Sequence, residues 1–193
     1  GSDSLSGVAD YQIDGASQGT STSGSFAYAD GAHTITAIAT DEAGNTGSLT
    51  LSDIQVDTVA PSVDSLTSSS HASGSWVSNS DVSLAWTGSD ATSSIADFAI
   101  DGASQGTNAS GSFAYADGTH TVTAVATDEA GNVSASLDLS DIRIDTVAPS
   151  VDSLTSSSHA SSTWVSNSDV DLAWTGSDSL SGVADYQIDG ASQ

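Results

Sequence analysis

Aspartate is the one residue type in this chain that could supply ligand chemistry at many places. The 193 residues include 25 acidic side chains, 23 of them Asp, against a single basic residue, Arg143. Carboxylate oxygens are the ligands that Ca²⁺ prefers, and a pair of carboxyl groups can also act as general acid and base. No Asp-x-Asp-x-Asp-Gly loop of the EF-hand type occurs, so a calcium site would need carboxylates from separate segments.

Composition excludes several other kinds of chemistry. The chain has no lysine for Schiff bases or phosphate binding, and no cysteine for disulfides, thiol catalysis or thiolate metal sites. Its formal net charge of −24 repels nucleic acid and anionic membranes, and no apolar run approaches the roughly 18 residues of a membrane span. We therefore expect neither nucleic-acid partners nor membrane insertion.

The chain is built from an internal repeat of about 88 residues. Residues 57–87 match 145–175 at 28 of 31 positions, and residues 1–45 match 88–132 at 34 of 45. Residues 176–193 are identical to 1–18, whereas the middle copy differs there, so the unit is an alternating pair of copies. This regularity argues against disorder, and we expect the sequence to belong to a longer array.

Each copy has the pattern of short antiparallel strands separated by turns, with no helical period. After a first strand at 62–67, apolar residues of the complete copy alternate in five further runs: Val82, Leu84 and Trp86; Phe98 and Ile100; Phe113 and Tyr115; His120, Val122, Ala124 and Ala126; and Leu137, Leu139, Ile142 and Ile144. About seven short strands in 88 residues predict an all-β antiparallel sandwich.

The tryptophans are candidate core residues. Trp86 shares a strand face with Val82 and Leu84, which favours a buried position. Trp76 lies in a Ser-rich segment, where it is either a second core residue or an exposed platform for stacking on a sugar.

Two segments of the sequence Asp-Thr-Val-Ala-Pro, at 57–61 and 145–149, have the character of short stiff linkers. They divide the chain into residues 1–56, the C-terminal two-thirds of a repeat; 57–144, a complete repeat; and 145–193, the N-terminal half of the next. Neither outer fragment is expected to fold stably alone. Together they add up to slightly more than one copy, so they are candidates for complementing each other between neighbouring chains.

Four features of the sequence resemble a known family. They are the Asp-Thr-x-x-Pro linker at Asp57–Pro61, the Ser-Leu-Thr-Ser-Ser segment at Ser65–Ser69, the Trp-containing strand at Val82–Trp86 and the Ala-Thr-Asp-x-Ala-Gly-Asn loop at Ala126–Asn132. Together they resemble the tandem bacterial immunoglobulin-like and fibronectin-III-like repeats of giant secreted cell-surface adhesins. The resemblance covers the whole chain. It implies an elongated array of Ig-like/FnIII-like sandwiches, many of which bind calcium.

With a fibronectin-like strand order, as the resemblance implies, the loop before the last strand lies near the domain's own N-terminus. The candidate metal ligands of the first junction are then Asp57, Asp90, Asp128, Glu129 and Asn132, facing the turns at Asp14 and Asp30 of the preceding copy. Those of the second junction are Asp145 and Asp178, which meet Asp101 and Asp117. Ca²⁺ is the cofactor that this set of hard oxygens would hold.

The abundance of aspartate also fits two interpretations that need no metal. Asp-Gly is a strong hairpin-turn signal, so Asp14, Asp30, Asp101, Asp117 and Asp189 can be turn formers alone. An acidic surface also keeps proteins soluble in high salt, although the excess of Asp over Glu favours turns and ligands over bulk charge.

We expect a structural role and not an enzyme, because an identical active site in every repeat would be unusual. The leading hypothesis is an extender of a giant extracellular adhesin, stiffened by Ca²⁺ at its junctions, whose partners are neighbouring repeats or identical chains. The alternatives are a subunit of a self-assembling extracellular filament or surface-layer lattice, and a carbohydrate- or ice-binding module that uses Trp76 and the Thr121-x-Thr123 face.

Overall fold

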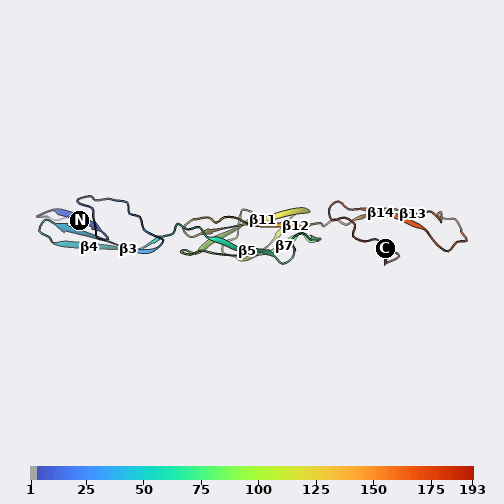
Figure 1. The fold of residues 1–193 in the computed structure, drawn as a ribbon, viewed down its shortest axis with the longest axis horizontal. Coiled ribbons are helices and arrows are strands. Elements are labelled where there is room, and N and C mark those ends of the chain that lie inside the picture. Colours follow the sequence, from blue (N-terminus) through green and yellow to red (C-terminus); the bar gives the residue numbers. More distant parts are fainter. Residues whose placement is uncertain (1–3) are drawn as a thin grey trace.

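The computed structural model describes residues 4–193, which form three β-modules arranged end to end in an elongated molecule (Figure 1). No helix occurs among these residues, and hence none that could cross a membrane. No sheet combines strands from two modules. Residues 1–3 of the expected first module lie outside the described part of the chain.

The strands fall into three groups along the chain. The first group is β1 (Val8–Ile13), β2 (Ala16–Ser17), β3 (Gly31–Asp41) and β4 (Thr46–Val56). The second is β5 (Ser62–Ser68), β6 (Trp76–Val77), β7 (Asp81–Ser89), β8 (Ile95–Ile100), β9 (Ala103–Ser104), β10 (Ser110–Ala114), β11 (Gly118–Asp128) and β12 (Leu137–Ile144). The third is β13 (Ser150–Ser156), β14 (Leu172–Ser177), β15 (Gln187–Ile188) and β16 (Ala191–Ser192).

The middle module is the complete antiparallel β-sandwich that the sequence predicts. One sheet has the order β10-β7-β5 and the other β6-β12-β11-β8-β9. All pairings within them are antiparallel except that between β6 and β12, which is parallel. Because a sheet buries its apolar side chains on one face, two sheets facing each other enclose a core.

The core of this module confirms the predicted alternation. Its buried apolar residues are Leu66, Val82, Leu84, Trp86, Phe98, Ile100, Val122, Ala124, Ala126, Ile142 and Ile144. Trp86 is 1% exposed and packs its ring against those of Phe98 and Phe113, with centroids 6.5 and 6.2 Å away. Such aromatic pairs add directional packing to the burial of apolar surface.

A bulge accounts for the change of phase in the last strand. The pairing of β11 with β12 shifts register between His120 and Val122, and Asp141 on β12 has a φ of 63°. The extra residue lets Leu139 and Ile142 face the same side although three positions separate them. Asp53 repeats this conformation in the first module, with a φ of 60°.

Two short strands, β6 and β9, were not expected from the sequence. Trp76 belongs to β6 and pairs with Arg143 of β12 in the ladder, so it is neither a loop residue nor a core residue. Its half-buried ring lies under the guanidinium of Arg143, 5.9 Å from the ring centroid. The two-residue length of β6 and β9 leaves no alternation to detect in the sequence.

The buried position of Trp86 generates a stability prediction. Trp86→Ala removes the largest side chain of the core, so the free energy of unfolding of the middle module should fall by about 3–5 kcal/mol. Trp164→Ala is the matched control, because Trp164 is fully exposed at 102%. Urea denaturation of dilute protein followed by far-ultraviolet circular dichroism measures both. Equal loss of stability in the two variants would contradict this assignment of the core.

Candidate metal site at the module junction

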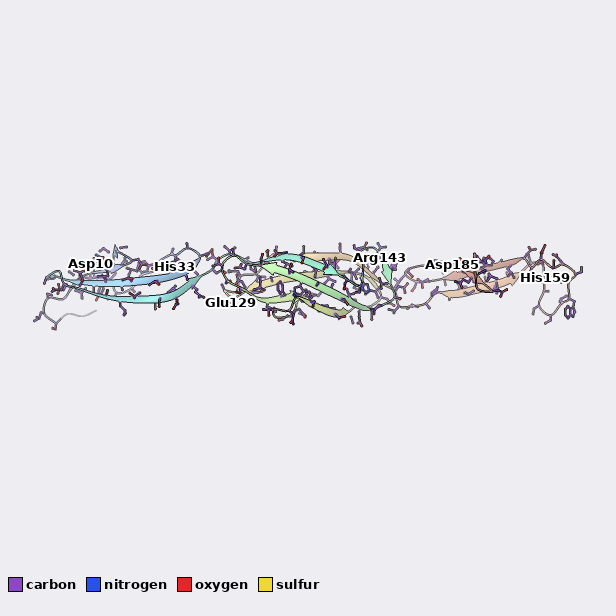
Figure 2. The ribbon with its side chains drawn as sticks, turned by 90° about the horizontal axis from the view of Figure 1, so that it is seen from below. Asp10, His33, Glu129, Arg143, His159 and Asp185 are labelled. Carbon is purple, nitrogen blue, oxygen red and sulfur yellow. The ribbon has the colours of Figure 1, made fainter. Side chains whose placement is uncertain are left out.

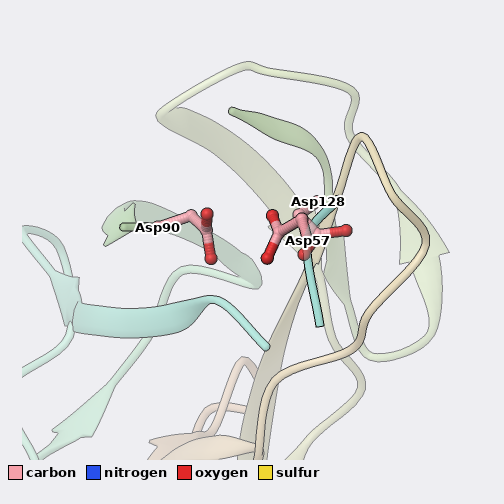
Figure 3. A group of neighbouring side chains, drawn as sticks. All are labelled: Asp57, Asp90 and Asp128. Atoms are coloured by element: carbon pink, nitrogen blue, oxygen red, sulfur yellow. The ribbon is translucent and has the colours of Figure 1, made fainter. Parts of the chain in front are cut away.

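Three aspartate side chains meet where the first module joins the second. Asp57 lies in the linker after β4, Asp90 follows β7, and Asp128 ends β11. Each offers a carboxylate oxygen within 4.8 Å of the others, and Figure 3 shows the three side chains pointing toward one another. The structure therefore brings together three carboxylates that are separated by 33 and 38 positions in the sequence.

Backbone amides hold the three carboxylates in place. Asp128 accepts hydrogen bonds from the backbone N–H of Asn132 (2.8 Å) and from its side-chain amide (2.9 Å). Ser93 donates its backbone N–H to both Asp90 (2.8 Å) and Asp57 (3.1 Å). The side-chain amide of Asn132 also donates to the Asp57 carbonyl oxygen (3.2 Å). These bonds tie the linker to two loops of the following module.

One carboxylate oxygen of the cluster is left without a donor. Oδ2 of Asp90 is buried and has no hydrogen-bond partner, and the hydroxyl of Ser93 beside it is buried and unpartnered as well. A buried charged oxygen without a partner is costly, which favours a ligand that supplies the missing interaction. This observation distinguishes the cluster from aspartates that only close turns.

The electrostatics of Asp128 reflect this environment. Its side chain is 2% exposed, and burial alone would raise its pKa. The hydrogen bonds from the Asn132 side chain and from the backbone of the Asn132 loop outweigh burial, so the pKa lies below its ordinary value. Asp128 is therefore charged at neutral pH and available to a cation.

The second junction repeats two of the three aspartates. Asp145 accepts hydrogen bonds from the backbone N–H of Ser181 (2.9 Å) and of Val147 (3.1 Å), as Asp57 does from Ser93 and Val59. Hydrogen bonds from Ser181 lower the pKa of Asp145, and the neighbouring Asp178 contributes in the same direction. Oδ2 of Asp178 is buried without a partner, like that of Asp90.

Asp30 and Asp117 lie at the junctions but bind the linkers instead of joining the three-carboxylate cluster. Asp30 accepts hydrogen bonds from the backbone N–H of Thr58 (2.9 Å) and from its hydroxyl (3.0 Å). Asp117 does the same for Thr146, with both distances at 2.9 Å. Each linker is thus hydrogen-bonded to the module before it through Thr and to the module after it through Asp.

The other predicted metal ligands are not part of the three-carboxylate cluster. Glu129 is exposed and lines the cleft at the first junction (Figure 2). Asn132 serves as a hydrogen-bond donor to the cluster. Asp14 and Asp101 have φ angles of 47° and 48°, as a hairpin turn requires, and each accepts a tyrosine hydroxyl, from Tyr28 and Tyr115 respectively. These two aspartates therefore fit the turn interpretation and do not join the cluster.

Sequence reasoning missed several partners of the aspartates. The Thr of each linker and the tyrosines of the repeated Tyr-Ala-Asp-Gly segments bind carboxylates that lie 14 to 29 positions away. Their recurrence in every copy was the available signal. His71, placed in a loop by the sequence, is 2% exposed and makes hydrogen bonds to the Ser70 hydroxyl and the Asn79 carbonyl oxygen.

Known proteins that resemble this chain are few and distant. No family model and no curated protein matches the chain. Among solved structures, fibronectin(III)-like modules of Clostridium thermocellum CbhA are similar, with 16% identity, 75% of this chain and 83% of that chain covered, and a TM-score of 0.38. The Ig-like and FnIII-like description of the fold thus stands on the sandwich topology of the middle module.

The lowered pKa of Asp128 predicts acid sensitivity. A carboxyl group whose pKa is depressed by folding stabilises the folded state above its unfolded pKa, and this contribution is lost as the pH falls through the folded pKa. The melting temperature of the chain should therefore drop below about pH 4. Asp128→Asn should melt lower at neutral pH and show a shallower acid dependence.

The exposed neighbour Glu129 supplies the control for this prediction. Glu129→Gln removes one negative charge beside the cluster without removing any of the hydrogen bonds of Asp128. Thermal melts between pH 7 and pH 2 should give the wild-type profile for this variant. An Asp128→Asn profile parallel to that of the wild type would show that Asp128 does not carry the effect.

Proposed function

We propose that this chain is an extender segment of an extracellular cell-surface adhesin or filament, in which Ca²⁺ stiffens the junctions between modules. The observation that carries the proposal is the junction cluster of Asp57, Asp90 and Asp128, with its buried and unpartnered carboxylate oxygen. The end-to-end arrangement of the modules supports a spacing role (Figure 1).

The donor set suits a hard divalent cation. Three carboxylates in close contact repel one another, and a cation between them removes the repulsion. Ca²⁺ takes six to eight oxygens at about 2.3–2.6 Å, so carbonyl oxygens and waters would complete the shell around Asp57, Asp90 and Asp128. Sites of this kind in extracellular modules bind calcium at roughly 0.1–1 mM, which matches calcium outside the cell.

A cation here would act on the stiffness of the junction. Asp57 belongs to the linker, whereas Asp90 and Asp128 belong to two loops of the middle module, so a shared ion would fix the linker to that module. Thr58, the next residue, is already bonded to Asp30 of the preceding module. Fixing two adjacent linker residues to opposite neighbours would leave the junction little freedom to bend.

Two of the three residues behind the carbohydrate- or ice-binding alternative, Trp76 and Thr123, are engaged elsewhere. Trp76 is half-buried beneath Arg143, and the hydroxyl of Thr123 donates to Asp138 at 2.9 Å. The positions of Trp76 and Thr123 in the middle module therefore fit an extender better than a flat binding surface. An extracellular location is part of the proposal.

Calcium titration tests the metal component. Raising free Ca²⁺ from zero, in EDTA, to about 10 mM should raise the melting temperature by roughly 5–15 °C, because a ligand bound only by the folded state stabilises it. Small-angle X-ray scattering should show the maximum dimension growing and the distribution of bend angles narrowing. Asp90→Asn and Asp128→Asn should each abolish most of the shift.

Asp81→Asn is the matched control for these variants. Asp81 is exposed and begins β7, whereas Asp90 follows the other end of the same strand. The control removes the same charge but leaves the cluster intact, so it should keep the full response to calcium. A wild-type melt that is identical in EDTA and in calcium would rule out the metal.

A further inference from the structure

Two of the five asparagines in this chain begin the sequence Asn-x-Ser. They are those of Asn108-Ala109-Ser110 and Asn132-Val133-Ser134, both in the middle module. Asn-x-Ser/Thr is the acceptor sequence for attaching a sugar to the side-chain amide nitrogen of the asparagine, and a used site lies on the surface of a secreted protein. The pattern is short, so the structural setting of each asparagine decides whether it can be modified.

Asn108 lies in the exposed connection between β9 and β10. Asn108, Ala109 and Ser110 are all exposed. The side-chain amide of Asn108 donates one hydrogen bond, to the Gln105 carbonyl oxygen (2.8 Å), and its backbone N–H reaches the same oxygen at 3.4 Å. The Ser110 hydroxyl has no hydrogen-bond partner within residues 4–193. Only the contacts with Gln105 have to break before the Asn108 amide can leave the surface.

The backbone on either side of Asn108 is anchored to the sandwich. Phe98 donates its N–H to the Gly106 carbonyl oxygen (2.8 Å), and Trp86 donates its N–H to the Ala109 carbonyl oxygen (3.0 Å). Asn108 lies between these anchors, in a short exposed segment. Such segments open locally at low free energy, so an enzyme can bind this one while the sandwich stays folded.

Asn132 has the opposite setting, although it begins the same acceptor sequence. It is half-buried, and its side-chain amide donates to the Asp128 carboxylate (2.9 Å) and to the Asp57 carbonyl oxygen (3.2 Å). The Ser134 hydroxyl accepts the backbone N–H of Ala126 (2.9 Å). Both amide hydrogens of Asn132 are thus used at the junction, and a sugar in place of one would break a contact of the three-carboxylate cluster.

We propose that Asn108 is a glycan attachment site and that Asn132, in the folded chain, is not. The inference rests on the proposed function for the extracellular location, where proteins display such glycans. The donor is a sugar activated as a phosphate ester at its C1 carbon. A separate transferase that recognises Asn-x-Ser/Thr delivers it.

The transfer step is a substitution at C1 of the sugar. Nδ2 of Asn108 forms a bond to C1, the bond from C1 to the phosphate oxygen breaks, and the phosphate leaves with the bonding electron pair. One amide proton passes to a base of the transferase, and nothing is oxidised or reduced. This chain contributes an amide that can turn outward and, two residues later, the Ser110 hydroxyl that the transferase recognises.

A sugar at Asn108 is compatible with the folded module. No residue of the buried core lies between Asn108 and Ser110, and the hydrogen bond that is lost is exposed. The counterpart of Asn108 in the first copy is Ser21, which cannot accept an N-linked sugar. Within this chain the glycan would therefore distinguish the middle module from the first.

Transfer to the folded chain tests the contrast between the two asparagines. The purified chain is incubated in one arm with a soluble N-glycosyltransferase and a nucleotide-activated hexose, and in the other with membranes that carry a lipid-linked oligosaccharide and its transferase. Peptide mass spectrometry should find a hexose or the oligosaccharide at Asn108, and the productive arm identifies the donor. Modification of Asn132 should be at least about 20-fold slower, because the junction has to open first.

Synthetic peptides 104–112 and 128–136 supply the reference for the fold. Each transferase used is one that modifies both peptides, so any difference in the folded chain comes from the structure. Ser110→Ala should abolish modification of Asn108, whereas Ser110→Thr should retain it. Ser112→Ala is the matched control, because Ser112 is a second exposed serine of β10 outside the acceptor sequence, and it should change nothing. Circular dichroism confirms that each variant remains folded.

Two results would overturn the proposal. One is a folded chain that stays unmodified at Asn108 in both arms, and the other is modification of Asn132 at the same rate as Asn108. Failure of the proposed function has a different signature, because Asn108 is not part of the junction cluster. A chain whose melting ignores calcium but which is modified at Asn108 would leave the glycan site standing and remove the metal.

Discussion

Burial of apolar side chains between two opposed sheets is the interaction on which the rest of this molecule depends. Trp86 and Val122 come from different sheets, and each is buried only because the other sheet is present. The outer modules carry nearly the same residues without that opposition, and apolar side chains such as Leu51 and Leu154 stay exposed. A sheet of this composition is stable only as one of a pair, because its backbone hydrogen bonds alone do not offset the entropy of ordering the chain.

The junctions depend on the core in turn. Asp90 follows β7 and Asp128 ends β11, and these strands belong to different sheets, so the packing of the two sheets decides whether the carboxylates meet. Once they meet, Ser93 and Asn132 fix them to the linker through amide hydrogen bonds. Placing these carboxylates close together raises the free energy of the folded state through their mutual repulsion. The sequence repeats two of the aspartates at the next junction, as Asp145 and Asp178.

Much of this arrangement could be predicted from the sequence, because strand alternation and turn residues are local properties. The core positions of β7, β8 and β11 followed from period-two patterning, and the closeness of Asp57 to Asp128 followed from the strand order that the family resemblance implied. Pairs formed across many residues could not be predicted in this way. The hydroxyl of Thr58 on Asp30, and Tyr115 on Asp101, depend on how turns fold back, and β6 is too short to show any alternation.

The parallel pairing of β6 with β12 determines how the middle module would respond to tension. A force that stretches the array pulls the N-terminal linker and the end of β12 in opposite directions along the long axis. Parallel strands next to the point of load slide past each other, so their hydrogen bonds carry the load together instead of opening one at a time. Trp76 beneath Arg143 adds a packed contact at the same place. A pull on the end of β12 would therefore have to break the contacts of β6 in the middle module together and not one after another.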